Sequence, residues 1–220
     1  ENGCHGGLLL HQKPILPPKK FISKLTYSSE CSRGFATLET LPKVGAMIRQ
    51  ILIYPDPRLK KICKPVEEIN DKLRDLADDM LETMYKAAGI GLAAPQIGEL
   101  IRVLVMDCEK DNISEKKSFI MFNPEIINSS EEINVYEEGC LSIPDQFAEI
   151  SRPKEVEVRW IDRNGSEKVG IFDGIWATCV QHEIDHLNGR LFVDYIGAVK
   201  RQIITRKMKK LKRDLTRKSD

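Results

Sequence analysis

Two histidines and a glutamate stand close together in the segment CVQHEIDHLNG, residues 179–189. His182 and His186 are four residues apart, and Glu183 directly follows the first histidine. On an α-helix, residues i and i+4 lie one above the other, about 6 Å apart along the axis, so both imidazoles can bind one metal ion. Glu183 then stands where it can reach a metal-bound water, as in the HExxH pattern of many zinc hydrolases.

The alternative is a polar helix surface on which Glu183 and Asp185 are solvated acids. The residues that flank the motif are strongly apolar, which favours a buried helix. Buried histidines and carboxylates need partners, and a metal ion would supply one. The segment therefore predicts a metal site.

Catalytic metal sites usually have three protein ligands and one position for water. Cys179 shares a helix face with His182 but lies about 10 Å along the axis from His186, too far for a short side chain, so we interpret it as a small core residue. Cys140 lies in EEGCLSIP, where Gly139 lets the chain bend. Residues 47–220 contain no third histidine, so we expect Cys140, which alone would suggest a buried thiol, to be the third ligand.

The glycine-rich segment GIGLAAPQIG, residues 89–98, follows a predicted helix and lacks the GKS/T and GxGxxG patterns of phosphate-binding loops. Its small residues allow close approach of another backbone, for example a peptide that lies alongside as an added strand. Gln96 is its single long polar side chain. Such a residue is usually on the surface, but beside a metal its amide N–H could stabilise an oxyanion.

The elements that must position these residues follow from the apolar periodicity. A helix is predicted over NDKLRDLADDMLETMYKAAG, with Asn70 as N-cap and Gly89 as stop, and a second over GIWATCVQHEIDHLNG. Strands are predicted over 101–107 and over SFIMFNPEII, the latter ended by Pro124, and an Asn164–Gly165 turn predicts a hairpin. The sum indicates an α+β fold.

Composition divides the chain into three parts. Residues 1–46 are rich in Pro, Ser and Thr and poor in acids, which indicates an unstructured leader or extension, or an organelle transit peptide. Residues 47–195 have the pattern of a globular domain, which contains the predicted metal site. Residues 196–220 form an amphipathic basic helix or tail, with ten Lys and Arg residues and one Asp between positions 200 and 218.

The whole chain has 220 residues, 41% of them hydrophobic, which suits one domain plus an extension. No apolar run reaches the roughly 18 residues of a membrane span. The six cysteines are scattered and form no CxxC pair, as expected for free thiols in a reducing compartment.

Three segments in this order, GIGLAAPQIG, EGCLSIP and QHEIDHLNG, together with YPDPRL, resemble the peptide deformylase family over most of residues 47–215. The resemblance implies that the HExxH helix packs among antiparallel strands. It implies metal ligation by Cys140, His182 and His186, with Glu183 as acid and base. Gln96 and the backbone N–H of Leu141 would form the oxyanion hole.

The resemblance also implies Fe²⁺ as the working metal, for which Zn²⁺, Ni²⁺ or Co²⁺ can substitute, and the N-formyl-methionine end of nascent peptides as substrate, with release of formate. We expect Ile90, Gly91, Gly139 and Val180 to contact the substrate, and Leu141 and Cys179 as further candidate walls of the methionine pocket. The family often has glycine after SIP, where this chain has Asp145.

Two rival functions are a metallopeptidase that cuts internal peptide bonds and an RNA- or ribosome-binding module that uses the basic tail. The tail is compatible with an enzyme that docks on the ribosome. We expect a monomer in the bacterial cytoplasm with no membrane contact. A mitochondrial or plastid location is the alternative if residues 1–46 are a transit peptide.

Overall fold

A computed structural model describes residues 45–109 and 118–219 of the chain. The chain divides into two units, residues 1–36 and residues 37–220, and all elements below belong to the second. The predicted leader 1–46 falls outside the described residues except at its last two positions. No helix in the described ranges is both long enough and apolar enough to cross a membrane.

The larger sheet has five strands that pair antiparallel in the order β1-β2-β3-β6-β7. They are β1 Gly91–Ala93, β2 Val103–Met106, β3 Phe119–Ser129, β6 Glu155–Ile161 and β7 Glu167–Asp173. The predicted Asn164–Gly165 turn joins β6 to β7, and Gly165 has the positive φ of 84° that favours glycine. Strand β2 is buried at all four positions, as expected for an unbroken apolar run.

A separate antiparallel hairpin pairs β4, Ile133–Cys140, with β5, Ile143–Pro153. Cys140 is the last residue of β4, so Leu141 and Ser142 form the turn. The register shifts between Gly139 and Cys140, which is a local irregularity in the ladder. The predicted bend at EEGCLSIP is therefore the tip of this hairpin.

The described ranges contain three α-helices: α1 Asp71–Lys86, α2 Gly174–Leu187 and α3 Ala198–Ser219. Short 3-10 helices are η1 Pro57–Lys60, η2 Ala94–Ile97 and η3 Phe192–Asp194. The side chain of Asn70 accepts a hydrogen bond from the Leu73 N–H, so the predicted N-cap is confirmed. Together with the antiparallel sheets, these helices confirm the α+β prediction.

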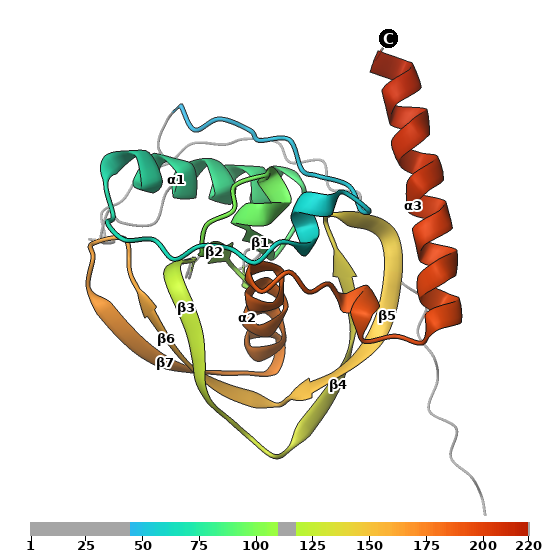
Figure 1. Cartoon of the computed structure of the whole chain (residues 1–220). Helices are drawn as coiled ribbons and strands as arrows, with labels where there is room; N and C mark the ends of the chain where they lie inside the picture. The colour runs from blue at the N-terminus through green and yellow to red at the C-terminus, as the bar shows by residue number, and fades with distance from the viewer. Residues whose placement is uncertain (1–44, 110–117, 220) are drawn as a thin grey trace, which may run out of the picture. The chain divides into compact units, whose positions relative to one another are not determined.

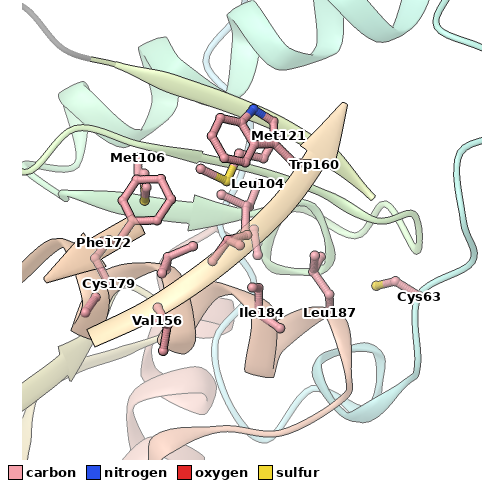
Figure 2. Packing of buried hydrophobic residues seen from close by; sticks show 14 residues of the cluster. Cys63, Leu104, Met106, Met121, Val156, Trp160, Phe172, Cys179, Ile184 and Leu187 are labelled. Carbon is pink, nitrogen blue, oxygen red and sulfur yellow. The ribbon is translucent and has the colours of Figure 1, made fainter. Parts of the chain in front are cut away.

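The helices α1 and α2 cover opposite faces of the five-stranded sheet. Alternation along β2 sends Val103 and Val105 into a cluster with α1, and Leu104 and Met106 into a cluster with α2. Figure 2 shows Cys179, Ile184 and Leu187 of α2 in this second cluster, together with Leu104 and Met106 of β2. In Figure 1, α2 runs between the strands β3, β6 and β7 on one side and the hairpin β4–β5 on the other.

A third apolar cluster ties the hairpin to the C-terminal elements. Ile143 and Ile150 of β5 pack with Phe192 of η3 and with Ile204 and Met208 of α3. All five side chains are at most 3% exposed. One face of the basic helix is therefore part of the core, which fixes its N-terminal half against the hairpin.

Two local expectations were wrong. Strand β3 does not end at Pro124 but continues to Ser129, because a register shift between Phe122 and Glu125 places the proline at an irregularity where no ladder hydrogen bond is required of it. Helix α1 ends at Lys86, and the left-handed position after it is Ala88, with φ 57°, not Gly89.

Candidate metal centre

Helix α2 holds His182, Glu183 and His186 in its buried C-terminal half, and the tip of the β4–β5 hairpin brings Cys140 to it. One ligand atom each from Cys140, His182 and His186 lies within 4.8 Å of the other two. Cys140 Sγ is 3.3 Å from His186 Nε2. The two imidazole rings have centroids 5.0 Å apart, as one helical turn between them requires.

A hydrogen bond fixes the orientation of His182. Its Nδ1 lies 2.8 Å from Oε2 of Glu138, a residue of β4 that is 5% exposed. Burial opposes the charged imidazole, but hydrogen bonds to Cys140 and Glu138 outweigh it and raise the pKa of His182 well above its usual value. This carboxylate–imidazole pair leaves Nε2 as the nitrogen for the Cys140 side, the arrangement common among metal-binding histidines.

Glu183 is buried beside these donors, and burial raises the pKa of its carboxyl to about 7. In the described part of the chain, Glu183 Oε2 and His186 Nδ1 are the buried side-chain polar atoms that have no hydrogen-bond partner. Burial also lowers the pKa of His186 well below its usual value, which favours the neutral, ligating imidazole. Glu183 thus has a free oxygen and a pKa suited to taking and returning a proton near neutral pH.

Gln96 of η2 is 1% exposed and held at both ends of its amide. Its Oε1 accepts a hydrogen bond from the Ala93 N–H at 2.7 Å. Its Nε2 lies 3.5 Å from Cys140 Sγ and 3.3 Å from Ser142 Oγ. The amide N–H₂ is therefore aimed at the hairpin tip rather than at the surface.

A cavity of about 640 Å³ opens onto these residues. Of the residues predicted to contact substrate, Ile90, Gly91 and Gly139 line it, and Leu141 and Cys179 line it as well. Val180 is fully buried in the core cluster of α2 and does not line this cavity. Glu137, Asp145 and Phe147 are further lining residues, from the outer part of the hairpin.

Cys140 and Cys179 were the two candidates for the third metal ligand, and the fold places them in different surroundings. Cys140 groups with the histidines, whereas Cys179 is 4% exposed and packs in the core cluster between α2 and the sheet. The Cys179 thiol lies 3.5 Å from the Ile90 carbonyl oxygen. A hydrogen bond with Cys108 and burial raise the pKa of Cys179 well above its usual value, so this thiol is not predisposed to lose its proton.

Glu138 and Ser142 are site residues that the sequence reasoning missed. One signal was available for Glu138: it precedes Cys140 by two positions, and alternate residues of a strand share a face. A buried carboxylate next to a ligand is a common partner for a metal-binding histidine. For Ser142, which contacts Gln96 across 46 positions of sequence, no local pattern gave a signal.

The donor set fits a divalent metal ion. A thiol and two imidazoles from a hairpin tip and a helix face one another, as in catalytic sites with three protein ligands. The buried carboxylate oxygen of Glu183 without a partner fits the same centre, because a catalytic site keeps a position for water.

The family model for polypeptide deformylase matches residues 48–202. This chain belongs to the polypeptide deformylase family. The peptide deformylase of Rhodopseudomonas palustris strain BisB18 is 53% identical over 166 residues, which is 74% of this chain and 94% of that protein. Membership makes the chain an enzyme, a metal-dependent hydrolase that removes formyl groups from peptides.

Solved peptide deformylases share the fold. The enzyme from Legionella pneumophila is 45% identical with a TM-score of 0.72, covering 77% of this chain and 98% of the other. The Ehrlichia chaffeensis deformylase in complex with actinonin is 39% identical with a TM-score of 0.73, covering 76% and 99%. The family match begins at residue 48 and thus excludes the segment 1–46.

Proposed function

We propose that this deformylase removes the formyl group from the N-terminal formyl-methionine of nascent proteins, with a divalent metal held by Cys140, His182 and His186. The observation that carries the proposal is the convergence of these three ligand atoms within 4.8 Å, beside the buried carboxylate of Glu183. A bound cation supplies Lewis acidity to a water molecule and to a carbonyl oxygen.

Fe²⁺ is the metal we propose, with Zn²⁺, Ni²⁺ or Co²⁺ as possible substitutes. One thiolate next to two imidazoles makes a softer donor set than three imidazoles, which suits iron as well as zinc. Metal analysis after anaerobic purification tests this choice. Iron below one tenth of the total bound metal would reject it without affecting the ligand set.

Glu183 is the proposed acid and base. Its carboxylate takes a proton from the attacking water and returns that proton to the nitrogen that leaves the formyl carbon. A pKa of about 7 lets one group do both near neutral pH. Gly91 supports this placement, since a Cβ built there would lie 2.4 Å from Glu183 Oε1, so the glycine gives the carboxylate its space.

Gln96 and the backbone N–H of Leu141 are the proposed oxyanion donors. The Gln96 amide is held by its neighbours, because the Ala93 N–H donates to its oxygen and Ser142 Oγ contacts its nitrogen. Donors that are oriented in advance need no rearrangement as charge develops. Leu141 stands at the turn of the hairpin, next to Cys140.

The cavity is the proposed methionine pocket. Ile90, Leu141 and Cys179 supply apolar wall, and Gly91 and Gly139 allow a peptide backbone to approach closely. Val180 lies in the core instead, so we leave it out of the proposed wall.

A substrate panel tests the activity against the rival metallopeptidase. The protein should release formate from formyl-Met-Ala and leave acetyl-Met-Ala and an unmodified longer peptide intact. Internal cleavage of the longer peptide at a comparable rate would favour the metallopeptidase. Cleavage of the acetyl peptide at the formyl rate would reject selectivity for the formyl group.

The ligand set is tested by a matched pair of cysteine variants. Cys140→Ser should weaken metal binding or change metal preference, whereas Cys179→Ser should do neither, because Cys179 belongs to the core cluster. Metal stoichiometry after gel filtration gives the readout. Equal loss of metal from both variants would overturn the choice of Cys140.

The basic helix α3 is a proposed ribosome contact. Arg206, Lys209, Lys212 and Arg213 border a surface recess with Pro55. Such a group of cations can bind phosphates, with an affinity that falls as salt rises. A variant with Lys209, Lys210 and Arg213 changed to glutamate should lose salt-sensitive ribosome cosedimentation and keep its rate on formyl-Met-Ala.

A control with Lys64, Lys72 and Lys168 changed to glutamate should keep both properties, because these exposed cations lie on other elements. Equal loss in both triple variants would show a nonspecific effect of charge. These substitutions are preferable to deleting residues 205–220, since Met208 in that range is 3% exposed in the core.

The division into a leader 1–46, a catalytic domain 47–195 and a basic tail 196–220 is part of the proposal, as are a monomeric state and the bacterial cytoplasm. Bacterial relatives at 51% to 54% identity support the location. Import into mitochondria or plastids of a fluorescent protein fused to residues 1–46 would favour the transit-peptide alternative. Gel filtration at the mass of a dimer would reject the monomer.

A further inference from the structure

A continuous chain of polar side chains leads from the protein surface to His182. The Tyr195 hydroxyl donates to Asp185 Oδ1 and Oδ2, both at 2.9 Å. Asp185 Oδ2 accepts from Arg152 Nη1 at 2.8 Å. Arg152 donates from Nε and Nη2 to the two oxygens of Glu138, at 2.5 and 3.1 Å, and Glu138 Oε2 meets His182 Nδ1 at 2.8 Å.

We call the side chains of Tyr195, Asp185, Arg152 and Glu138 the relay. Each of them comes from a different part of the fold. Glu138 lies on β4, Arg152 on β5 and Asp185 on α2 within the HExxH segment, and Tyr195 directly follows η3. The relay therefore holds the helix of the two histidines to both strands of the hairpin that carries Cys140. Asp185 is part of this link, not a solvated acid of the helix surface.

Arg152 is the centre of the relay. Its side chain is 6% exposed, and that of Glu138 is 4% exposed, so the pair is shielded from water. A buried ion pair is favourable when its remaining hydrogen-bonding groups also have partners. Asp185 and the two-point contact with Glu138 provide these partners, and they fix the plane of the Glu138 carboxylate.

Tyr195 holds the outer end. Besides its hydroxyl contacts to Asp185, its ring lies beneath the guanidinium of Arg152, with Cζ 5.1 Å from the ring centroid. Tyr195 is 45% exposed, so it forms the boundary between the relay and solvent. The cation–π contact is with Arg152 and the hydrogen bonds are with Asp185, and these two residues are themselves hydrogen-bonded to each other.

We propose that Arg152 and Tyr195 are positioning residues, which act through Glu138 to hold His182 in the orientation that binds the metal. The proposal rests on the metal centre of the proposed function. Carboxylates that contact metal-binding histidines control ring orientation and metal affinity. The relay extends this control two residues further, to the surface at Tyr195.

The test uses the full chain loaded with Co²⁺ under anaerobic conditions. Arg152→Lys keeps the positive charge but removes the planar guanidinium that donates two hydrogen bonds to Glu138. In competition with a chelator, this variant should raise the Co²⁺ dissociation constant by about 10- to 100-fold. Tyr195→Phe keeps the ring and removes the hydroxyl, and should raise it by a smaller factor. The cobalt absorption bands should shift in both variants.

Coupling distinguishes a relay from two separate effects. Because both residues act through Glu138, the double variant should weaken Co²⁺ binding by less than the product of the two single factors. Arg159→Lys is the matched control, since the exposed Arg159 lies on β6 of the other sheet and pairs with Glu125 at 2.7 Å. It should leave Co²⁺ affinity and spectrum unchanged.

The melting temperatures of the metal-free variants show whether the relay positions His182 or only stabilises the fold. Lower melting temperatures with a Co²⁺ dissociation constant and spectrum equal to those of the parent would overturn the proposal, because the relay would then be structural only. If Arg152→Lys does not fold, Tyr195→Phe decides by the same readouts. If the parent protein binds no Co²⁺, the proposed metal centre itself is overturned. The measurement on the parent alone separates this outcome from a failure of the relay.

Discussion

The Sγ atom of Cys140 lies 3.3 Å from Nε2 of His186, although 46 positions separate these residues in the chain. The contact exists because a hairpin tip meets the buried face of a helix. Two elements that are each fixed in a core cluster bring the donors together, with Ile143 after the hairpin tip and Ile184 on the helix both at most 5% exposed. The packing of these two elements therefore holds the three donor atoms close together.

The proposed acid–base role of Glu183 predicts that turnover can be lost while metal binding is kept. Glu183→Gln removes the proton acceptor but keeps the shape of the side chain. We expect kcat for formyl-Met-Ala to fall by about 10²- to 10⁴-fold while metal stoichiometry stays that of the parent. Glu149→Gln, on the exposed side of β5, is the control. Retention of more than half the parent kcat would exclude Glu183 as the base.

The fixed amide of Gln96 predicts a loss in kcat rather than in KM. Gln96→Glu keeps an oxygen for the Ala93 N–H but replaces the N–H₂ donor. Removal of one oxyanion donor costs about 10²- to 10³-fold in kcat. Ser142→Ala keeps the Gln96 donor and removes only the hydroxyl that contacts it, so the loss in kcat should be smaller. The role of Gln96 fails if the two variants lose kcat equally or if only KM changes.

The close approach at Gly91 predicts a steric effect on catalysis. In Gly91→Ala the new Cβ would lie 2.4 Å from Glu183 Oε1 and 2.8 Å from Cys179 Sγ, so the carboxylate must move. We expect kcat to fall by at least about tenfold, with the metal retained. Gly197→Ala is the control, because no atom of the described residues lies within 4 Å of its Cβ position. An unchanged kcat in Gly91→Ala would show that the carboxylate has room to move.

The carboxylate of Asp56 should contribute to the stability of the folded protein in a way that depends on pH. It caps η1 through the Arg58 N–H, and its hydrogen bond to the Arg58 side chain holds the pKa of its carboxyl well below its usual range. A lowered folded-state pKa stabilises the protein above the unfolded value of about 3.9, and the effect is lost progressively as the pH falls from that value through the folded-state pKa. Asp56→Asn should cost about 1 kcal/mol at pH 7.

The difference in the free energy of unfolding in urea between Asp56→Asn and the parent should therefore narrow when the pH is lowered from 7 to 3.5, and it should close fully only as the pH falls through the folded-state pKa. Asp71→Asn is the control, since the side chain of Asp71 is 90% exposed and should contribute nothing measurable. A difference between Asp56→Asn and the parent that stays constant over this pH range would contradict the effect of charge.

Much of the site was predictable because its residues carry local patterns. The spacing of His182 and His186 placed both on one helix face, and the same geometry separated Cys179 from the pair. The turn residues around Cys140 predicted a bend, and the hairpin tip is at that position. These inferences depend on residues a few positions apart, where backbone geometry decides.

The relay from Tyr195 to His182 was not predictable in this way. Arg152 and Glu138 are 14 positions apart on paired strands, and Arg152 and Asp185 are 33 positions apart. Their contacts depend on strand register and on how the hairpin meets α2, which no local period encodes. Likewise Pro124 predicted a strand end, but the register shift in β3 accommodates it.

The central claim is that metal at this centre performs the deformylation. The most direct test measures the rate of formate release from formyl-Met-Ala against the metal bound per chain, in protein purified and titrated without oxygen. The rate should rise in proportion to the bound metal and stop rising at one ion per chain. Formate release at the full rate from metal-free protein, or no release at one ion per chain, would contradict it.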